Sequence, residues 1–438
     1  MSSIEAVAQA IQEVQGVRAD ELGRASGFIR RQRAMSGSQY AQMLVFGWWS
    51  NPQATVEELA RCGGSVGGAI SGQGLDQRFT AAGAAFMQQV LSEAVQQLIQ
   101  ADQGVKGLLE RFKAVYIQDS TTIRLPDGLS EVWAGCSGRV EKHTQAALKI
   151  QVQQEMRQGG IHQLWLQAGR DHDLHTKVPV EALVAGSLRI ADVGFFDLDY
   201  FAQLGQTGHY WLSMLKGGTC LSDPTGRPYQ VDALLRQTDQ DCLEHAILLG
   251  KTKRLPARLL ARRLAPDLAQ QRRQQLRQEA QREGQVVSQA RLTLAGWLVY
   301  VTNVPPNLLS FDELFRLSRI RWQIELLFKL WKSEGRLDES RSNNPWRILC
   351  ELYAKLLALL IQHWVLLIAC WHFPDRSLTK AIHTVRHFAM AVAIACSSPS
   401  ALSHVLAAIC LSLSHGCRVF KSKKKPSTFQ HLFLEGLS

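Results

Sequence analysis

Residues 146–169 read AALKIQVQQEMRQGGIHQLWLQAG, and this stretch decides the fold class. Apolar and polar residues alternate over 146–156 and again over 161–169, which is the period of half-buried β-strands. Gly159 and Gly160 lie between the two segments, where glycine permits a tight turn. The stretch therefore predicts a β-hairpin.

Further strands are predicted on both sides of this hairpin. The apolar segment AVYIQD precedes it and ends in Asp119, while SLRIAD follows it and ends in Asp192. A short helical stretch and the strand HYWLSMLK complete the pattern. Hairpin-linked strands, then a helix and further strands are the order of a ribonuclease-H-like domain, so we expect an α/β fold with such a core.

The strand order is interrupted by a β-rich insertion, which we assign to residues 217–306. Short strand-like pieces there surround the highly charged helical stretch 267–284, and the apolar strand GWLVYVTNVP follows. A single helix from Phe311 to about Glu334 is expected to resume the main fold.

Helical regions are predicted before and after this domain, which we assign to residues 111–375. Residues 1–110 are expected to form a helical region. Thr55 and Glu58 fit a capping box that opens a short helix. The glycines and second helical stretch that follow suggest a helix-turn-helix over 55–80, which would make residues 1–110 a DNA-binding region, with an ordinary helical pair as the alternative. Residues 376–438 are predicted to be a helical C-terminal region with a basic tail, KSKKKP.

Composition favours a polyanionic partner. Lys and Arg number 49 against 38 for Asp and Glu, a formal net charge of +11, which suits nucleic acid first and an anionic membrane second. The nine Cys include no C-x-x-C pair, which argues against a zinc ribbon and a disulfide framework. The N-terminus has no segment of signal-peptide type. The apolar run 356–371 is shorter than the ~20 residues of a membrane span, so we expect a buried helix and no membrane partner.

The segment LFRLSRIRWQIELLFKLWKSEG carries the most informative charge pattern. At about 100° per residue, Arg321, Lys329 and Lys332 fall within ~40° of Glu325 on a helix. The apolar stripe on another face is expected to pack in a core: Leu317, Ile320, Ile324, Phe328 and Trp331. A solvated face with ion pairs is the alternative interpretation.

Three carboxylates together suggest a metal site. Asp119 and Asp192 end predicted strands, and Glu325 on a later helix could complete a cage for two hard cations. Two such ions stabilise the attacking and leaving oxygens of an in-line phosphoryl displacement. Asp197 and Asp199 compete for the second position, but Asp192 directly ends the apolar run and is favoured.

The same segments resemble a known family. R-W-Q-I-E-L-L-F-K-L-W-K is similar to the Y-R-E-K signature of insertion-sequence transposases of the IS-four family, which are cut-and-paste DDE enzymes. Arg321, Glu325 and Lys332 fit the signature's spacing, whereas Ser318 stands at the position of its tyrosine. The segments around Asp119 and Asp192 resemble the family's first and second aspartate motifs.

The resemblance implies DNA cleavage at transposon ends and strand transfer into target DNA. It implies two Mg²⁺ ions, with Mn²⁺ able to substitute, held by Asp119, Asp192 and Glu325. It also implies a set of DNA-binding side chains: Arg321, Lys329, Lys332, Trp297 and Ser318. In the family a tryptophan stacks on a flipped base, but an ordinary core tryptophan is the equal alternative for Trp297.

The implied partners are double-stranded DNA, as terminal inverted repeats and as target, and a second copy of the chain on paired ends. The implied location is the bacterial cytoplasm, with the nucleoid. Two alternatives remain open. One is a related nuclease that cuts without joining, and the other, motivated by Ser318, is a DNA-binding relic or inhibitor of transposition.

Overall fold

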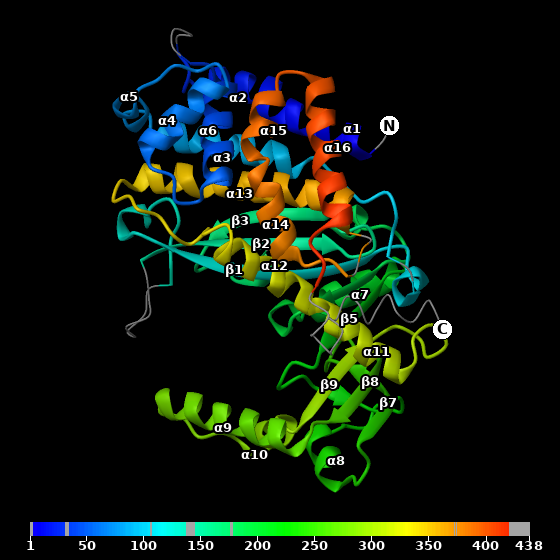
Figure 1. Ribbon diagram of the computed structural model, residues 1–438. Helices are drawn as coiled ribbons and strands as arrows, with labels where there is room; N and C mark the ends of the chain where they lie inside the picture. The colour runs from blue at the N-terminus through cyan, green and yellow to red at the C-terminus, as the bar shows by residue number, and fades with distance from the viewer. Residues whose placement is uncertain are drawn as a thin grey trace. The chain divides into compact units, whose positions relative to one another are not determined.

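The computed structural model describes residues 3–30, 35–105, 107–136, 145–175, 178–371, 373 and 375–419. The predicted basic tail lies outside these residues. The chain divides into two compact units (Figure 1). The first unit comprises Met1–Lys106, Asp119–Asp171 and Trp322–Ser438, and the second comprises Gly107–Gln118 and His172–Arg321.

The N-terminal part of the first unit is helical, as predicted. Its elements are α1 (Ser3–Gln12), a π-helical segment (Glu13–Arg18), α2 (Ala19–Ala25), α3 (Gly37–Ser50), α4 (Val56–Ser65), α5 (Gly72–Asp76) and α6 (Ala81–Val95). The capping box at the start of α4 is confirmed, because the Thr55 side chain accepts from Glu58 N and the Glu58 side chain accepts from Thr55 N. The helix after the glycines is present, with Ser71 as its N-cap, but α5 has only five residues.

The C-terminal helices complete the first unit. They are α13 (Pro345–Cys370), α14 (Leu378–His387), α15 (Ala389–Ala395) and α16 (Pro399–His415). The core is built around α13, which packs against α3, α6 and α16. By length and composition alone α13 could cross a membrane, yet 94% of its most apolar window is buried inside the protein. The prediction of a buried helix is confirmed, although the helix is longer than expected.

The predicted hairpin is confirmed in the same unit. Strands β2 (Ala146–Glu155) and β3 (Ile161–Ala168) pair antiparallel, with Val152 opposite Leu164. Gly159 in the turn has a φ of +77°, and a Cβ there would lie 2.5 Å from the Leu367 side chain. Only glycine suits this position.

The second unit is a sheet with helices at its edges. Its strand order is β1-β4-β5-β9-β8-β7-β6. The strands are β1 (Val115–Leu125), β4 (Leu188–Ala191), β5 (Tyr210–Met214), β6 (Leu221–Ser222), β7 (Cys242–Leu249), β8 (Leu255–Arg263) and β9 (Trp297–Thr302). The pairs β1–β4 and β4–β5 are parallel, and the remaining pairs are antiparallel.

The predicted end of the first strand is wrong. Strand β1 continues through Asp119 to Leu125, and the chain passes from the second unit to the first inside it. The residues after Asp119 include Thr121, Thr122 and Ile123, whose β-branched side chains favour extended backbone. The polar run that suggested a strand end is thus part of the strand.

Five α-helices lie in the described part of this unit: α7 (Leu198–Gln206), α8 (Val231–Gln237), α9 (Pro266–Arg282), α10 (Gln289–Leu294) and α11 (Phe311–Ser318). The predicted charged helix and the strand after it are confirmed as α9 and β9. Short 3₁₀ turns occur at Gly107–Arg111, Asp127–Leu129, Asp173–His175, Val180–Ala182 and Val193–Phe195.

The prediction of one continuous helix after Phe311 is wrong. The segment forms α11 (Phe311–Ser318), a 3₁₀ turn (Arg319–Arg321) and α12 (Trp322–Ser333). At the break, the Ser318 hydroxyl donates to the Phe315 carbonyl at 3.0 Å. Such a side-chain bond to the preceding turn competes with regular helix geometry. The apolar stripe predicted for this segment is buried throughout.

Candidate active site

Asp119 lies in the middle of β1 and is half-buried. Its Oδ1 accepts a hydrogen bond from the Ser120 backbone N–H at 2.8 Å. The residue before it, Gln118, is buried. The strand therefore holds the backbone of Asp119 in a defined position.

Asp192 directly follows β4, as predicted. It precedes the 3₁₀ turn at 193–195, but its side chain accepts no capping hydrogen bond there. Within the described part of the chain, its carboxylate has no hydrogen bond or ion pair. The competing acids do have partners, since Asp197 caps α7 and Asp199 forms a 2.6 Å ion pair with Lys253. Asp192 is thus the acid of this segment that is left available for a ligand.

The strand register relates the two aspartates. Gln118 in β1 pairs with Ala191 in β4, and the two strands run parallel. Asp119 and Asp192 each follow one member of this pair. Both carboxylates therefore come one residue after matched positions on neighbouring parallel strands.

A buried arginine, Arg189, stabilises this pair of strands. It lies in β4 and donates from Nε and Nη2 to Gln118 Oε1, at 3.2 and 2.9 Å. Its guanidinium also lies over the Tyr200 ring, 5.0 Å from the centroid. Burial lowers the pKa of Arg189 below its ordinary value. Arg189 is a functional-site residue that was not predicted, although a cation inside the apolar run SLRIA is a signal for a buried polar role.

Helix α12 carries Glu325, Lys329 and Lys332. Glu325 is half-buried and Lys329 is exposed. Lys332 Nζ approaches the Thr122 carbonyl of β1 at 3.4 Å, a long contact within the first unit. This contact links α12 to the strand that carries Asp119. Arg321 lies in the 3₁₀ turn before α12, so it does not belong to the same helix.

Two residues predicted to contact DNA are placed differently from that expectation. Ser318 is buried and bonded to Phe315, so it does not share an exposed face with Glu325. The break in the helix is the physical reason. Trp297 is buried in β9, with the Arg263 guanidinium 4.4 Å from its ring centroid. Its surroundings favour the alternative of an ordinary packed tryptophan.

The three predicted ligands are all carboxylates, and their chemistry suits a hard cation. Among the described residues, no three His, Cys, Asp or Glu side chains are grouped so as to hold a metal ion. Asp119 and Glu325 belong to the first unit and Asp192 to the second. Three carboxylates form an all-oxygen set, which is the chemistry that Mg²⁺ prefers.

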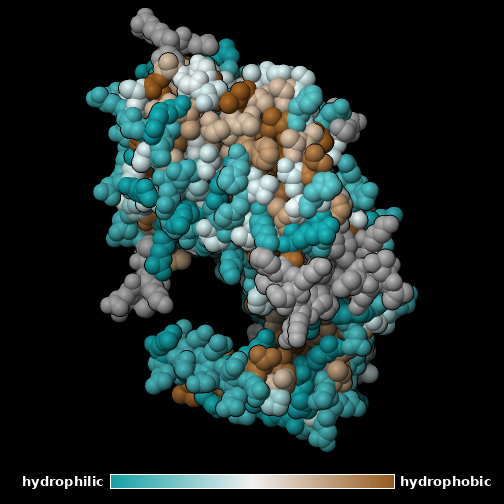
Figure 2. All heavy atoms as spheres, viewed as in Figure 1, coloured by the Kyte–Doolittle hydropathy of each residue, from teal (hydrophilic) through white to brown (hydrophobic). Residues whose placement is uncertain are grey.

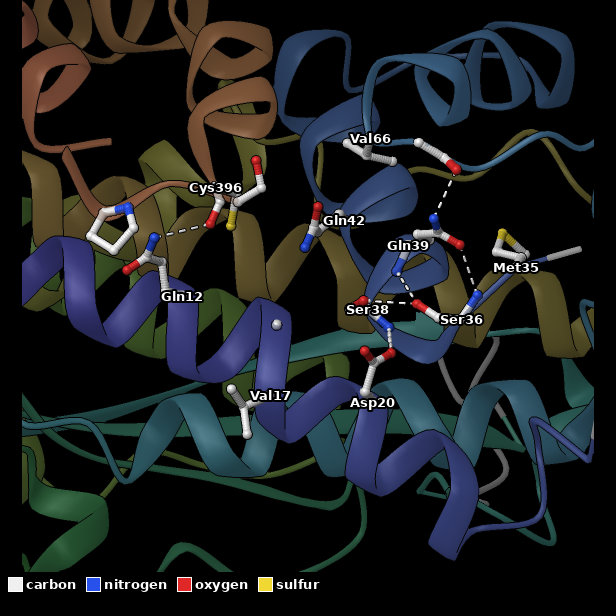
Figure 3. A pocket seen from close by; sticks show the side chains of 14 residues that line it. Gln12, Val17, Asp20, Met35, Ser36, Ser38, Gln39, Gln42, Val66 and Cys396 are labelled. Carbon is white, nitrogen blue, oxygen red and sulfur yellow. Dashed lines mark hydrogen bonds between the residues drawn. The ribbon is translucent and has the colours of Figure 1, made fainter. Parts of the chain in front are cut away.

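A cavity in the first unit is poorly suited to binding a phosphate group. It has a volume of about 810 Å³ and is lined by α1, the π-helical segment, α2, α3, the residues after α4 and the α15–α16 link (Figure 3). Asp20 is the one charged side chain among the described residues that line it, and its Oδ1 accepts from the Ser38 backbone N–H. A lone acid repels an anion, so this cavity is no candidate for nucleic acid.

Comparison with known proteins identifies the family. The protein-family model described as "Transposase DDE domain" matches residues 110–361 of this chain. The transposase for insertion sequence element IS231F of Bacillus thuringiensis subsp. israelensis is 28% identical over 365 residues, covering 78% of this chain and 76% of that protein. The IS231B transposase of Bacillus thuringiensis subsp. berliner is 26% identical over 366 residues, covering 78% and 75%. The IS1151 transposase of Clostridium perfringens is 24% identical over 367 residues, covering 78% and 76%. Since the family match spans more than half of the chain, the protein belongs to the DDE transposase family and is an enzyme of DNA transposition.

Proposed function

We propose that this transposase cuts DNA at the ends of an insertion sequence and joins the freed ends to target DNA, using Asp119, Asp192 and Glu325 as its catalytic carboxylates. The observation that carries the proposal is the parallel register of β1 and β4, in which both aspartates follow a matched pair. Because the two strands are paired in parallel register, the aspartates follow neighbouring points of the backbone, which supports a shared role.

A ribonuclease-H-like core is the proposed frame for these residues. In the second unit β1 is followed in the sheet by the parallel strands β4 and β5. In the first unit β1 is next to the antiparallel hairpin β2–β3. This strand order supports the proposal. The helical N-terminal region is the proposed DNA-binding part, residues 217–306 the proposed insertion, and residues 376–438 the proposed C-terminal region.

DDE transposases generally use divalent metal ions, and we assign two Mg²⁺ ions, or Mn²⁺, to the three carboxylates. When bound, such ions stabilise the attacking and leaving oxygens of an in-line displacement at phosphorus. The protein's part is to hold the ligands. Asp192 has no competing partner among the described residues, which supports its role as a ligand. Arg189 keeps the two strands aligned directly before the aspartates.

The cations near Glu325 are assigned to the DNA backbone. Lys329 is exposed on α12, one turn after Glu325, and can reach a phosphate. Arg321 and Lys332 are proposed to hold neighbouring phosphates. The proposed substrates are terminal inverted repeats and target DNA, bound by a homodimer that pairs two ends. The proposed location is the bacterial cytoplasm, at the nucleoid.

Substitution of the three carboxylates tests the catalytic assignment. Asp119→Asn, Asp192→Asn and Glu325→Gln should each abolish Mg²⁺-dependent cleavage of a duplex carrying the element's end, while duplex binding is retained. Asp199→Asn is the matched control, because it removes a carboxylate seven residues after Asp192 that is paired with Lys253. It should keep cleavage. Full activity in any of the first three variants would remove that residue from the assignment.

A joining assay separates the proposed function from its alternatives. Labelled end DNA and a supercoiled target are incubated with the wild-type protein and Mg²⁺. Joined products are the expected result. Cleavage without joined products would make the protein a nuclease, and binding without cleavage would make it a relic or an inhibitor.

A further inference from the structure

Helix α9 is the most solvent-surrounded long helix of the second unit. Its buried residues are Ala269 and Ala280 alone. Arg273 on the same side donates from Nε to the Leu292 carbonyl of α10 at 3.1 Å and attaches the helix to the unit. In Figure 1, α9 runs away from the ends of β8 and β9, and Figure 2 shows its surface as mainly hydrophilic.

The outward side of α9 has an unusual composition. Six exposed glutamines lie on it: Gln270, Gln271, Gln274, Gln275, Gln278 and Gln281. Exposed arginines, Arg277 and Arg282, accompany them. The acids of the helix are confined to its two ends, at Asp267, Glu279 and then Glu283 just beyond. The central stretch 269–278 carries three arginines and no acid, so it presents positive charge and amide groups.

This helix lacks the internal support that a polar helix ordinarily has. A helix that is polar all round spans solvent between domains, is stabilised by many i,i+4 ion pairs, or is only marginally stable by itself. None of the four arginines of α9 has an ion pair within the part of the chain that the structure describes. The composition and the missing pairs together indicate an external partner.

The side chains of α9 suit duplex DNA better than a second protein surface. In the major groove, one glutamine amide can form two hydrogen bonds to an adenine, at N6 and N7. One arginine guanidinium can likewise form two hydrogen bonds to a guanine, at O6 and N7. That groove is wide enough for one α-helix. A helix-to-helix contact would instead need an apolar stripe. The exposed large apolar side chain on α9 is Leu268, at its N-terminal end.

We propose that α9 docks in the major groove of duplex DNA, with Gln274, Arg277 and Gln278 at the centre of the contact. The proposal rests on the proposed function, since it adds a DNA-reading element to an enzyme that acts on DNA. It assigns to the insertion a contact with base edges, separate from the carboxylates that carry the chemistry.

The test combines a triple variant with a composition-matched control. Gln274→Ala, Arg277→Ala and Gln278→Ala together remove the proposed contact and keep a helix-favouring sequence. The control combines Gln285→Ala, Gln289→Ala and Arg291→Ala, which are exposed residues of the same types just after α9. The α9 variant should bind duplex end DNA about ten- to a hundredfold more weakly than wild type, as expected for one or two base contacts. The control should bind as wild type does.

Two further measurements identify the groove. Amide hydrogens of α9 should exchange rapidly in the free protein and slowly with the duplex. Replacing adenines of the duplex by 7-deazaadenine, which lacks the N7 acceptor in the major groove, should weaken wild-type binding and leave the triple variant unaffected.

The outcomes separate this inference from the proposed function. Unchanged exchange in α9, with unchanged affinity of the triple variant, would overturn the docking proposal while cleavage by the wild type still stood. Slowed exchange without sensitivity to 7-deazaadenine would overturn the major-groove assignment and leave a phosphate contact. Slow exchange in the free protein that speeds up on dilution would assign α9 to contact between two copies. A wild type that neither cuts nor joins would defeat the proposed function itself.

Discussion

Helices α13 and α9 are stabilised in opposite ways, the first by burial and the second by interactions within the helix. In α13 almost every residue from Ile348 to Leu367 is buried, and neighbours pack against it on all sides. In α9 only two alanines are buried. Local features must therefore hold α9: Pro266 at its first turn, Asp267 near its N-terminus and Arg282 near its C-terminus. Helix α13 is stabilised by tertiary packing in its unit. Helix α9 is stabilised mainly by interactions within the helix, which contribute little.

The largest effect is expected from a buried ion pair in α13. Lys355 is 3% exposed and donates from Nζ to Glu351 at 2.7 Å and to the carbonyls of Arg336 and Glu339. Lys355→Met leaves the Glu351 charge buried and unpaired, so the free energy of unfolding should fall by about 3–5 kcal/mol. Urea unfolding followed by circular dichroism measures this loss of unfolding free energy. The double variant Lys355→Met with Glu351→Leu should recover most of this loss, because no unpaired charge stays buried. If the double variant were as unstable as Lys355→Met alone, the unpaired Glu351 charge would not be the cause.

The same substitution in both helices sharpens the comparison. Leu357 in α13 is fully buried, so Leu357→Ala should lower the free energy of unfolding by roughly 2–5 kcal/mol. Leu268 in α9 is 51% exposed, so Leu268→Ala should change it by less than about 0.5 kcal/mol. Thermal unfolding of the two variants beside wild type is sufficient. Similar losses in both would mean that α9 is as tightly packed as α13.

Acid should weaken the packing around α13 through His363. This side chain is buried, Nε2–H donates to the Gly159 carbonyl at 2.8 Å, and burial lowers the pKa of His363 to about 4. The unfolded chain takes up the proton near pH 6.5, whereas the folded protein does not until about pH 4. Stability should therefore fall as pH decreases across this window, by on the order of 2–3 kcal/mol.

His363→Gln keeps a donor for Gly159 and removes the titration, so its stability should depend less on pH between 6.5 and 4. His404→Gln is the control, because His404 is exposed and should leave the wild-type dependence unchanged. Equal pH dependence in all three proteins would exclude His363 as the source.

The smallest effect on the global unfolding transition is expected from a helix-breaking substitution inside α9. Gln275→Gly should destabilise the helix locally by about 1 kcal/mol through helix propensity alone. Hydrogen exchange should speed up in α9 and stay unchanged in α13, with Gln275→Ala slowing exchange slightly. A change in the global unfolding transition would show that α9 is coupled to the rest of its unit.

Local patterns predicted much of this architecture. Alternation predicted the hairpin at Gly159, and the apolar run predicted a buried helix at the position of α13. Local patterns did not reveal that β1 continues past Asp119, because polar residues are typical both of a strand end and of the exposed face of a continuing strand. They also did not reveal the break at Arg319–Arg321, since the periodicity of the apolar stripe persists through it.

The site was predicted unevenly for the same reason. Asp192 at the end of β4 follows from the local sequence, and its placement is confirmed. The burial of Ser318 and Trp297 depends on tertiary packing that helix and strand periods do not report. Arg189 bonds to a residue 71 positions earlier, a long-range relation that only the register discloses. The catalytic roles and the domain boundaries stay predictions.

The continuity of β1 through Asp119 constrains how this protein can change length. Side chains alternate between the two faces of a strand, so one residue gained or lost between Tyr116 and Asp119 would turn the carboxylate to the opposite face. The same change would shift the pairing of Gln118 with Ala191. A surface loop such as the one after Gly284 has no such constraint and can absorb additional residues. In a library of random single-residue insertions, none between Tyr116 and Asp119 should therefore survive selection for activity, even where substitutions at the same positions are accepted.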